Sequence, residues 1–302
     1  MKNITVKYTI RNQFNAEVAY KEVDFPGGEK HIVLDLDRLS LYNEDSISFS
    51  IFAVLMSHED VITLGLIFNA IRAEYFNTPI NLEVPYMPYA RQDRITQVGE
   101  PLSIKFMANY INLMCKPDTA LVWDPHSNVT EALINNFVNI DRTMLYDDCA
   151  PLHGLLRDAK RSNRDIVLVS PDAGAFKKTY LLAGHLHTKY NIDCTVVSAD
   201  KLRDTKTGKI FKTIVNDPMG RLTENSFVLI ADDICDGGMT FIELSKAINA
   251  ITKVHSMNLW VSQGIFSKGV QAVSPYFDNI IASIKFGSDK KSYELNTHDV
   301  SI

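Results

Sequence analysis

The chain of 302 residues lacks the marks of a secreted, membrane-anchored or metal-finger protein. No uninterrupted apolar run reaches the length that spans a bilayer, and the opening residues MKNITVKYTI contain no apolar signal-peptide core. The four cysteines are far apart in the sequence and have no metal-ligand spacing. We therefore expect a cytoplasmic protein with reduced thiols and no membrane partner.

An excess of positive charge is also absent. The net charge of −5 argues against a general nucleic-acid binder, so we expect no nucleic-acid partner. There is no low-complexity segment and no long linker rich in proline, glycine or serine. With 46% apolar and 22% charged residues, the composition is that of an ordinary globular protein that is long enough for two domains.

Short apolar runs alternate with helical patterns along most of the chain. The strand candidates are Asn81–Val84, Thr119–Trp123, Ile166–Ser170, Cys194–Ser198, Phe227–Ala231, Asn258–Ser262 and Asn279–Ile284. The helix candidates are Glu59–Phe76, Leu102–Cys115, Val129–Asn136, Ala150–Ala159, Gly174–Thr188 and Met239–Ile251. This alternation predicts an α/β fold with mostly parallel sheets flanked by helices.

The N-terminal segments differ from the rest of the chain. Ile4–Ile10, Val18–Asp24 and His31–Leu36 read as antiparallel strands joined by polar turns. The strand–helix series divides near residues 141–148 into two halves. We predict two similar domains, residues 1–143 and residues 144–302, with the last residues packing back on the first domain.

The segment FVLIADDICDGGMT carries the strongest functional signal. Its apolar run ends in Asp232 and Asp233, and a glycine turn then precedes a helix, so backbone N–H groups converge on one point. That geometry suits a phosphate monoester, whereas the two acids suit vicinal sugar hydroxyls. The segment therefore predicts a ribose 5-phosphate site, whose phosphate-binding turn comprises Asp236, Gly237, Gly238, Met239 and Thr240. The alternative is an ordinary strand–turn–helix with solvated acids.

Two polar loops in the first half follow predicted strands. The string Pro88-Tyr89-Ala90-Arg91-Gln92-Asp93 offers the planar donors of Arg91 to a polyphosphate, although a surface ion-pair loop would look similar. Trp123-Asp124-Pro125-His126 places His126 just after a strand, where a purely structural histidine is the alternative.

Two more polar loops lie in the second half. In Ser170-Pro171-Asp172-Ala173-Gly174, Asp172 lies between a strand and a helix, where it can ligate a hard metal ion, cap the helix, or do both. The polar stretch from Asp200 to Lys209 contains the cations Lys201 and Arg203, and its plain interpretation is a solvated hairpin.

Together these loops resemble the ribose-phosphate diphosphokinase family, also called phosphoribosyl pyrophosphate synthetases. The family has P-Y-A-R-Q-D, D-x-H and S-P-D-x-G loops and a flap with a Lys-x-Arg pair. It shares its ribose-phosphate loop with type I phosphoribosyltransferases. The resemblance extends from about Glu59 to Lys268 and implies two phosphoribosyltransferase-like domains, with ATP bound through the first and ribose 5-phosphate through the second.

The resemblance also implies residue roles. Arg91, Gln92 and His126 would bind the ATP polyphosphate, His126 and Asp172 would hold Mg²⁺, and the flap pair Lys201 and Arg203 would be catalytic. Phe25-Pro26-Gly27-Gly28-Glu29 resembles a loop that reaches adenine from a neighbouring subunit, with Phe25 stacking on the base and Glu29 accepting a hydrogen bond. A homo-oligomer, either a dimer or a hexamer, is therefore expected.

Several residues depart from the family pattern. The usual Asp-Thr-x-Gly-Thr loop has Gly237 for its threonine and Met239 for its glycine. Gly27, Gly99 and Pro125 replace an Asn or Asp, an arginine and a leucine. Because backbone amides can bind phosphate without these side chains, we expect altered affinity and retained function.

The expected reaction is transfer of a diphosphoryl group from ATP to ribose 5-phosphate, giving phosphoribosyl pyrophosphate and AMP. Two alternatives remain open. A base-transferring phosphoribosyltransferase would use the same C-terminal loop, but it would not need the Arg-Gln-Asp loop or a second domain. A non-catalytic regulatory paralogue would be expected to lose the Lys-x-Arg pair or the metal acids, all of which are present.

Overall fold

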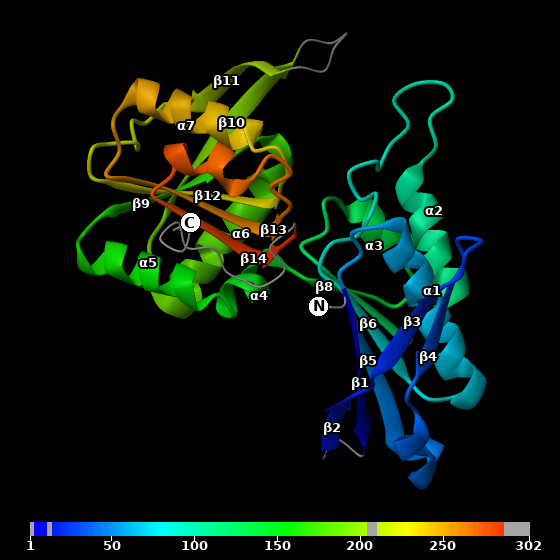
Figure 1. Cartoon of the computed structure of the whole chain (residues 1–302). Helices are drawn as coiled ribbons and strands as arrows, with labels where there is room; N and C mark the ends of the chain where they lie inside the picture. Colours follow the sequence, from blue (N-terminus) through cyan, green and yellow to red (C-terminus); the bar gives the residue numbers. More distant parts are fainter. Residues whose placement is uncertain (1–2, 11–13, 204–209, 287–302) are drawn as a thin grey trace. The chain divides into compact units, whose positions relative to one another are not determined.

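The computed structural model describes residues 3–10, 14–203 and 210–286. The chain divides into two units, Met1–Ile140 and Asp141–Ile302 (Figure 1). Each unit is built on a six-stranded, mostly parallel sheet flanked by helices, and the first also has antiparallel N-terminal strands. The predicted α/β fold class is therefore confirmed. In the described ranges, no helix combines the length and apolar character needed to cross a membrane.

The sheet of the first unit has the strand order β2-β1-β5-β6-β7-β8. Its strands are β1 (Ile4–Ile10), β2 (Phe14–Glu17), β5 (Ile47–Ala53), β6 (Ile80–Val84), β7 (Thr119–Trp123) and β8 (Phe137–Ile140). Strand β1 is antiparallel to β2 and β5, whereas the other neighbours are parallel. The strands β3 (Tyr20–Asp24) and β4 (Lys30–Leu34) form a separate antiparallel pair.

One face of this first sheet holds the apolar core. The connecting helices are α1 (His58–Glu74), α2 (Ser103–Tyr110) and α3 (Asn128–Leu133). Because β5 to β8 are neighbours in chain order, right-handed crossovers place their helices on one face. Figure 1 shows α1, α2 and the β3–β4 hairpin there. Burial alternates accordingly along β1 and β5, with every second residue buried.

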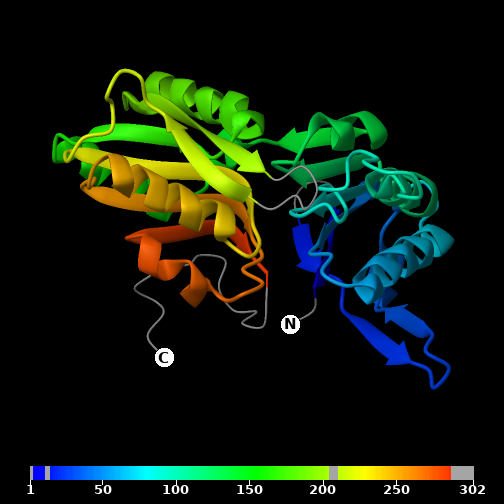
Figure 2. The same ribbon diagram turned by 90° about the horizontal axis from the view of Figure 1, so that it is seen from above.

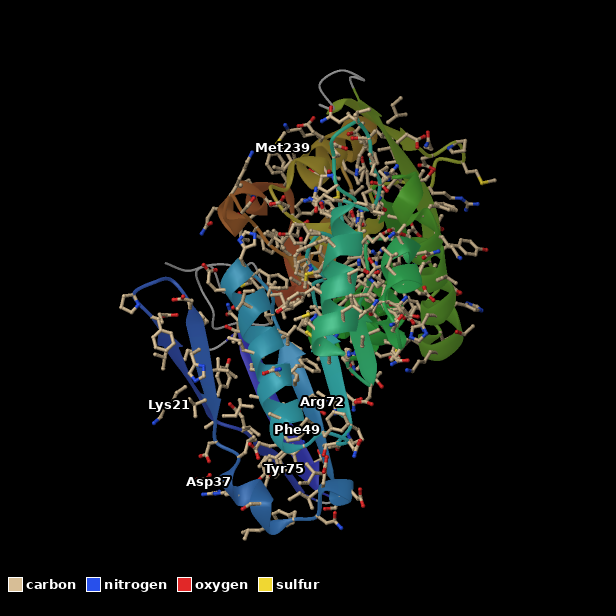
Figure 3. All side chains as sticks on the ribbon, turned by 90° about the vertical axis from the view of Figure 1, so that its right-hand side faces the viewer. Lys21, Asp37, Phe49, Arg72, Tyr75 and Met239 are labelled. Atoms are coloured by element: carbon tan, nitrogen blue, oxygen red, sulfur yellow. The ribbon has the colours of Figure 1, made fainter. Side chains whose placement is uncertain are left out.

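The C-terminal end of α1 shows how the first unit is held together. Arg72 donates a hydrogen bond of 2.9 Å to Asp118, which in turn accepts one of 2.8 Å from the backbone N–H of Ile80. Beside it, the rings of Phe49 and Tyr75 lie 5.7 Å apart, so the helix end is fixed against the sheet (Figure 3).

The sheet of the second unit has the order β11-β10-β9-β12-β13-β14, and only β11 is antiparallel to its neighbour. Its strands are β9 (Asp165–Ser170), β10 (Thr195–Arg203), β11 (Ile210–Asn216), β12 (Ser226–Cys235), β13 (Ser256–Gly264) and β14 (Asn279–Lys285). Its helices are α4 (Arg142–Asp147), α5 (Ala150–Arg161), α6 (Ala173–Tyr190) and α7 (Met239–Ile251).

Both faces of this second sheet are covered. Figure 2 shows α7 on one face and α5 and α6 on the other. Strands β9 and β13 are accordingly buried along nearly their whole length, as expected of parallel strands between two helical layers. Strand β9 has β10 on one side and β12 on the other, so the chain order reverses between β9 and β12. In open α/β sheets, ligands bind at the carboxyl ends of strands beside such a reversal.

The predicted elements match the structure with some corrections. Helix α3 ends at Leu133, shorter than predicted, because residues 134–136 lead directly into β8. Strand β12 continues to Cys235, so Asp232 and Asp233 lie within the strand and not after it. The sequence analysis did not include β2, β5, β8, β11 or α4 among its expected elements; of these, β2, β8 and α4 are short, with four to six residues each.

Asp147 ties the end of α4 to α6. Its carboxylate accepts hydrogen bonds from His185 at 2.7 Å, Lys189 at 2.5 Å and Tyr190 at 2.7 Å. Burial raises the pKa of Asp147, but the hydrogen bonds from Lys189, His185 and Tyr190 together hold it well below its ordinary value.

We predict that the Asp147→Asn variant is less stable than the wild type at pH 7 by roughly 1–2 kcal/mol. Since the folded pKa lies below the unfolded one, the carboxylate's contribution is complete above about pH 4 and declines as the pH falls further. The difference between the two proteins should therefore shrink below pH 4. Urea unfolding in a Trp123→Phe background, with Trp260 as the remaining tryptophan, measures it in the second unit.

Asp193→Asn is the matched control. Asp193 accepts a hydrogen bond of 2.7 Å from His187, also on α6, but the two side chains are 85% and 64% exposed. Its substitution should change the free energy of unfolding by less than about 0.5 kcal/mol. Equal effects of the two substitutions would contradict the role given to Asp147.

Candidate active site

Three carboxylates gather at the strand-order reversal of the second unit. Asp172 directly follows β9 and caps α6, with its Oδ1 accepting from the backbone N–H of Ala175 at 3.1 Å. Asp232 and Asp233 lie near the carboxyl end of β12, which pairs with β9 in parallel. The topology thus brings together the acids that the sequence placed on two different loops.

The adjacent acids of β12 carry an electrostatic cost. Asp233 is buried, and the Asp232 side chain is only 14% exposed. Burial raises the pKa of Asp232 well above its ordinary value, and the neighbouring Asp233 and Asp172 raise it further. Two backbone hydrogen bonds of 2.9 Å, from Asp233 N–H to Asp232 and from Ile234 N–H to Asp233, orient the carboxylates.

Arg142, at the start of α4, offsets part of this cost. Its side chain is 2% exposed, its Nη1 donates to the carbonyl oxygen of Ala231 at 3.1 Å, and its Nη2 lies 3.8 Å from Oδ1 of Asp232. The positive charge lowers the pKa of Asp232 and opposes the effect of burial. Arg142 has no signal in the sequence, because it is 89 positions from Ala231 and belongs to no motif.

Lys201 supplies a second cation. Its Nζ donates to Oδ2 of Asp172 at 2.6 Å, and the lysine side chain is 9% exposed. Burial raises the pKa of Asp172, but the hydrogen bond and charge of Lys201 bring it below its ordinary value. A residue predicted to be catalytic and one predicted to hold metal therefore pair with each other in the absence of substrate.

The turn after β12 has the geometry predicted for an anion site. Gly238 has a φ of +78° and caps α7, and a Cβ at this position would lie 2.4 Å from Cγ2 of Val273. Only glycine fits both conditions. The backbone N–H groups of Met239 and Thr240 open the helix, where no preceding turn supplies their acceptors. Met239 is 51% exposed at this end of α7 (Figure 3).

Ser267 and Lys268 also lie beside this turn. A Cβ on Gly237 would lie 3.5 Å from Cε of Lys268 and 3.9 Å from Oγ of Ser267. The loop that carries them is tied to β12, because the N–H groups of Ile265 and Phe266 donate to the Cys235 carbonyl at 2.8 and 3.0 Å. Lys268 belongs to none of the motifs found in the sequence.

In the first unit, the loops after β6 and β7 meet. Asp93 hydrogen-bonds Ser127 and lies 3.3 Å from Nε of Arg94. Burial raises the pKa of Asp93, but Ser127, Arg94 and the nearby His126 lower it to below its ordinary value. Arg91, Gln92 and His126 are all exposed near this contact.

Phe25 and Glu29 lie at the tip of the β3–β4 hairpin. The Phe25 N–H donates to the Glu29 carbonyl at 2.8 Å, and the Phe25 side chain is 49% exposed. This two-stranded sheet is separate from the six-stranded sheet whose loops carry Arg91 and His126.

The flap residue Arg203 and the metal ligands were also predicted from the sequence. Arg203 ends β10, but its side chain and residues 204–209 lie outside the described residues. Within the described ranges, no group of three or more His, Cys, Asp or Glu side chains forms a metal-ligand set. Proteins often bind Mg²⁺ through one or two carboxylates plus water and substrate phosphates, and the carboxylate of Asp172 fits that mode.

Comparison with known proteins identifies distant relatives. A ribose-phosphate pyrophosphokinase of Sulfurisphaera tokodaii is 31% identical over 58% of this chain and 54% of that protein. The corresponding protein of Thermococcus kodakarensis is 25% identical over 88% of this chain and 86% of that protein. In the first of these matches, the chain spans about half the length of its relative. No family model matches the chain.

One solved structure has the same fold. The phosphoribosylpyrophosphate synthetase from Mycobacterium smegmatis superposes with a TM-score of 0.63, over 88% of this chain and 80% of that one. The sequence identity in this match is 17%, so the likeness concerns the fold alone.

We predict that Gly238→Ala lowers the melting temperature by several degrees, because it adds both left-handed strain and a clash with Val273 worth roughly 1–3 kcal/mol. Gly237→Ala is the matched control. A Cβ there makes only ordinary contacts, the nearest at 3.5 Å, so its melting temperature should remain close to that of the wild type. Calorimetry compares the two, and equal melting temperatures would refute the proposed constraint.

We also predict energetic coupling between Arg142 and Asp232. Arg142→Met leaves the buried carboxylates without this counter-charge and should cost roughly 3 kcal/mol. Adding Asp232→Asn should recover at least about 1 kcal/mol, because the uncompensated charge is then removed. Urea unfolding of the single and double variants measures the coupling, and strictly additive effects would contradict it.

Proposed function

We propose that the chain, which is similar to ribose-phosphate pyrophosphokinases at 25–31% identity, is a ribose-phosphate diphosphokinase. It would convert ATP and ribose 5-phosphate into phosphoribosyl pyrophosphate and AMP. The observation that carries this proposal is the carboxyl edge of the second sheet, where three carboxylates, two cations and a helix-opening glycine turn lie together.

Ribose 5-phosphate binds at this edge of the second unit. The 5-phosphate accepts hydrogen bonds from the N–H groups at the start of α7 and from the Thr240 hydroxyl. Lys268, beside Gly237, adds positive charge. Asp232 and Asp233 accept hydrogen bonds from the ribose hydroxyls, which requires ionised carboxylates. Arg142 favours this ionised state because its charge lowers the pKa of Asp232.

ATP binds through the loops after β6 and β7 of the first unit. Arg91 and Gln92 contact its polyphosphate, together with His126. In a homo-oligomer, Phe25 and Glu29 of a neighbouring subunit contact the adenine. Magnesium, held by Asp172 with substrate oxygens and water, would neutralise charge on the phosphates.

The transfer is an in-line displacement. The C1 hydroxyl oxygen forms a bond to the β-phosphorus, the bond from that phosphorus to the α–β bridging oxygen breaks, and AMP leaves with the electron pair. The hydroxyl proton passes to solvent. Lys201 and Arg203 place positive charge beside the diphosphoryl group as the charge redistributes. To do so, Lys201 exchanges its contact with Asp172 for a contact with substrate.

The first test is incubation with ATP, Mg²⁺ and ribose 5-phosphate, followed by chromatography. We expect AMP and phosphoribosyl pyrophosphate in equal amounts, and only when ribose 5-phosphate is present. Consumption of supplied phosphoribosyl pyrophosphate with a nucleobase, without AMP formation, would instead identify a transferase. Inactivity in both assays would favour the non-catalytic paralogue.

We predict that Lys201→Ala lowers kcat by roughly two orders of magnitude, since the lost cation acts mainly in the transition state. Binding of ribose 5-phosphate, measured by calorimetry, should change less than about threefold. Lys253→Ala, which removes an exposed lysine beyond the end of α7, is the control and should retain full turnover. Near-normal turnover of Lys201→Ala would remove this residue from catalysis.

A further inference from the structure

A cavity lies among the helices α4, α5 and α6 of the second unit. It has a volume of about 530 Å³ and is lined by the end of α4, the second half of α5 and the end of α6. Asp172 caps the N-terminus of the 18-residue helix α6, so Tyr190 at the other end of the helix lies about 27 Å from Asp172 along its axis. The cavity is therefore distinct from the carboxylate site.

Aromatic rings form one wall of this cavity. The His153 ring stacks on Tyr146 at 4.3 Å, and Tyr190 meets both rings edge-on, at 4.8 Å from His153 and 5.2 Å from Tyr146. The rings are held by internal bonds, because Nε2 of His153 donates to the Tyr146 carbonyl at 2.8 Å and the Tyr190 hydroxyl donates to Asp147 at 2.7 Å. The wall is preorganised for packing against a flat ring.

Positive charge forms the rim. Arg157, Lys160 and Arg161 are exposed on the last turns of α5, and the residues described as lining the cavity include no acid. Lys160 donates to the Asn191 carbonyl, and Arg161 makes a loose ion pair of 3.9 Å with Asp158. Arg157 makes no hydrogen bond or ion pair within the described ranges.

Helix stability alone does not explain this arrangement. Basic residues in the last turn of α5 interact favourably with the helix dipole, which suffices for Lys160 and Arg161. It does not explain an aromatic wall under the cations, or a cavity within the usual range of ligand pockets of about 300–1,000 Å³. The planar guanidinium groups of Arg157 and Arg161 can each donate two hydrogen bonds to a phosphate, and the aromatic rings can pack against a planar base. Together they suit a phosphate joined to such a base.

We propose that this cavity binds a mononucleotide, with its base against His153 and Tyr190 and its phosphates at Arg157 and Arg161. The site is independent of the proposed diphosphokinase reaction.

Photolabelling of the full chain with 2-azido-ADP, followed by mass spectrometry of its peptides, tests this. We expect label within residues 150–192. Labelling of that segment should fall at least tenfold in Arg157→Ala/Arg161→Ala and stay unchanged in the control Arg221→Ala/Lys253→Ala, which removes two exposed cations elsewhere in the unit. Label in the first unit reports the separate ATP site, so the two proposals fail separately.

Competition by pyrophosphate, which has phosphates but no base, tests whether the site recognises the base. Unlabelled ADP should displace the probe from residues 150–192 at a concentration at least tenfold lower than pyrophosphate does. Absence of label from this segment, equal labelling in both double variants, or equal competition by pyrophosphate would overturn the proposal. Arg157→Gln/Arg161→Gln replaces the alanine variant if its far-ultraviolet circular dichroism or melting temperature departs from that of the wild type.

Discussion

The organising constraint of the C-terminal unit is the accumulation of negative charge where β9 and β12 diverge. Asp172, Asp232 and Asp233 lie close enough to influence one another's ionisation, and burial adds to the cost. Arg142 from α4 and Lys201 from β10 provide the opposing charge. A helix and a strand on either side of the acids thus each contribute a compensating charge.

The two sheets position their loops by different means. In the second unit, β9, β12 and β13 are buried from both faces, which gives the acid-bearing strand ends a rigid base. In the first unit, one face carries the core and burial alternates along the strands. There the loops after β6 and β7 are joined at their tips, where Asp93 meets Ser127. Local bonds hold the exposed Arg91 and His126 in one region.

The sequence was sufficient wherever local pattern determines structure. Periodicity predicted most parallel strands and all the long helices. The glycine turn predicted the start of α7, because Gly238 has a left-handed backbone conformation and has no room for a Cβ beside Val273. Strand β5 was missed although residues 47–51 alternate apolar and polar residues as a half-buried strand does. Arg142 and Lys268 were missed because only the tertiary fold brings them to the site. The pairing of Lys201 with Asp172 likewise depends on how β10 lies against β9.

The central claim is that the ribose held at this edge attacks the β-phosphorus of ATP. ATP labelled with ³²P at the β position tests this most directly, in the presence of Mg²⁺ and ribose 5-phosphate. The claim predicts that the label moves to phosphoribosyl pyrophosphate while the AMP formed is unlabelled. Label recovered in ADP would place bond breaking at the γ-phosphorus and contradict diphosphoryl transfer.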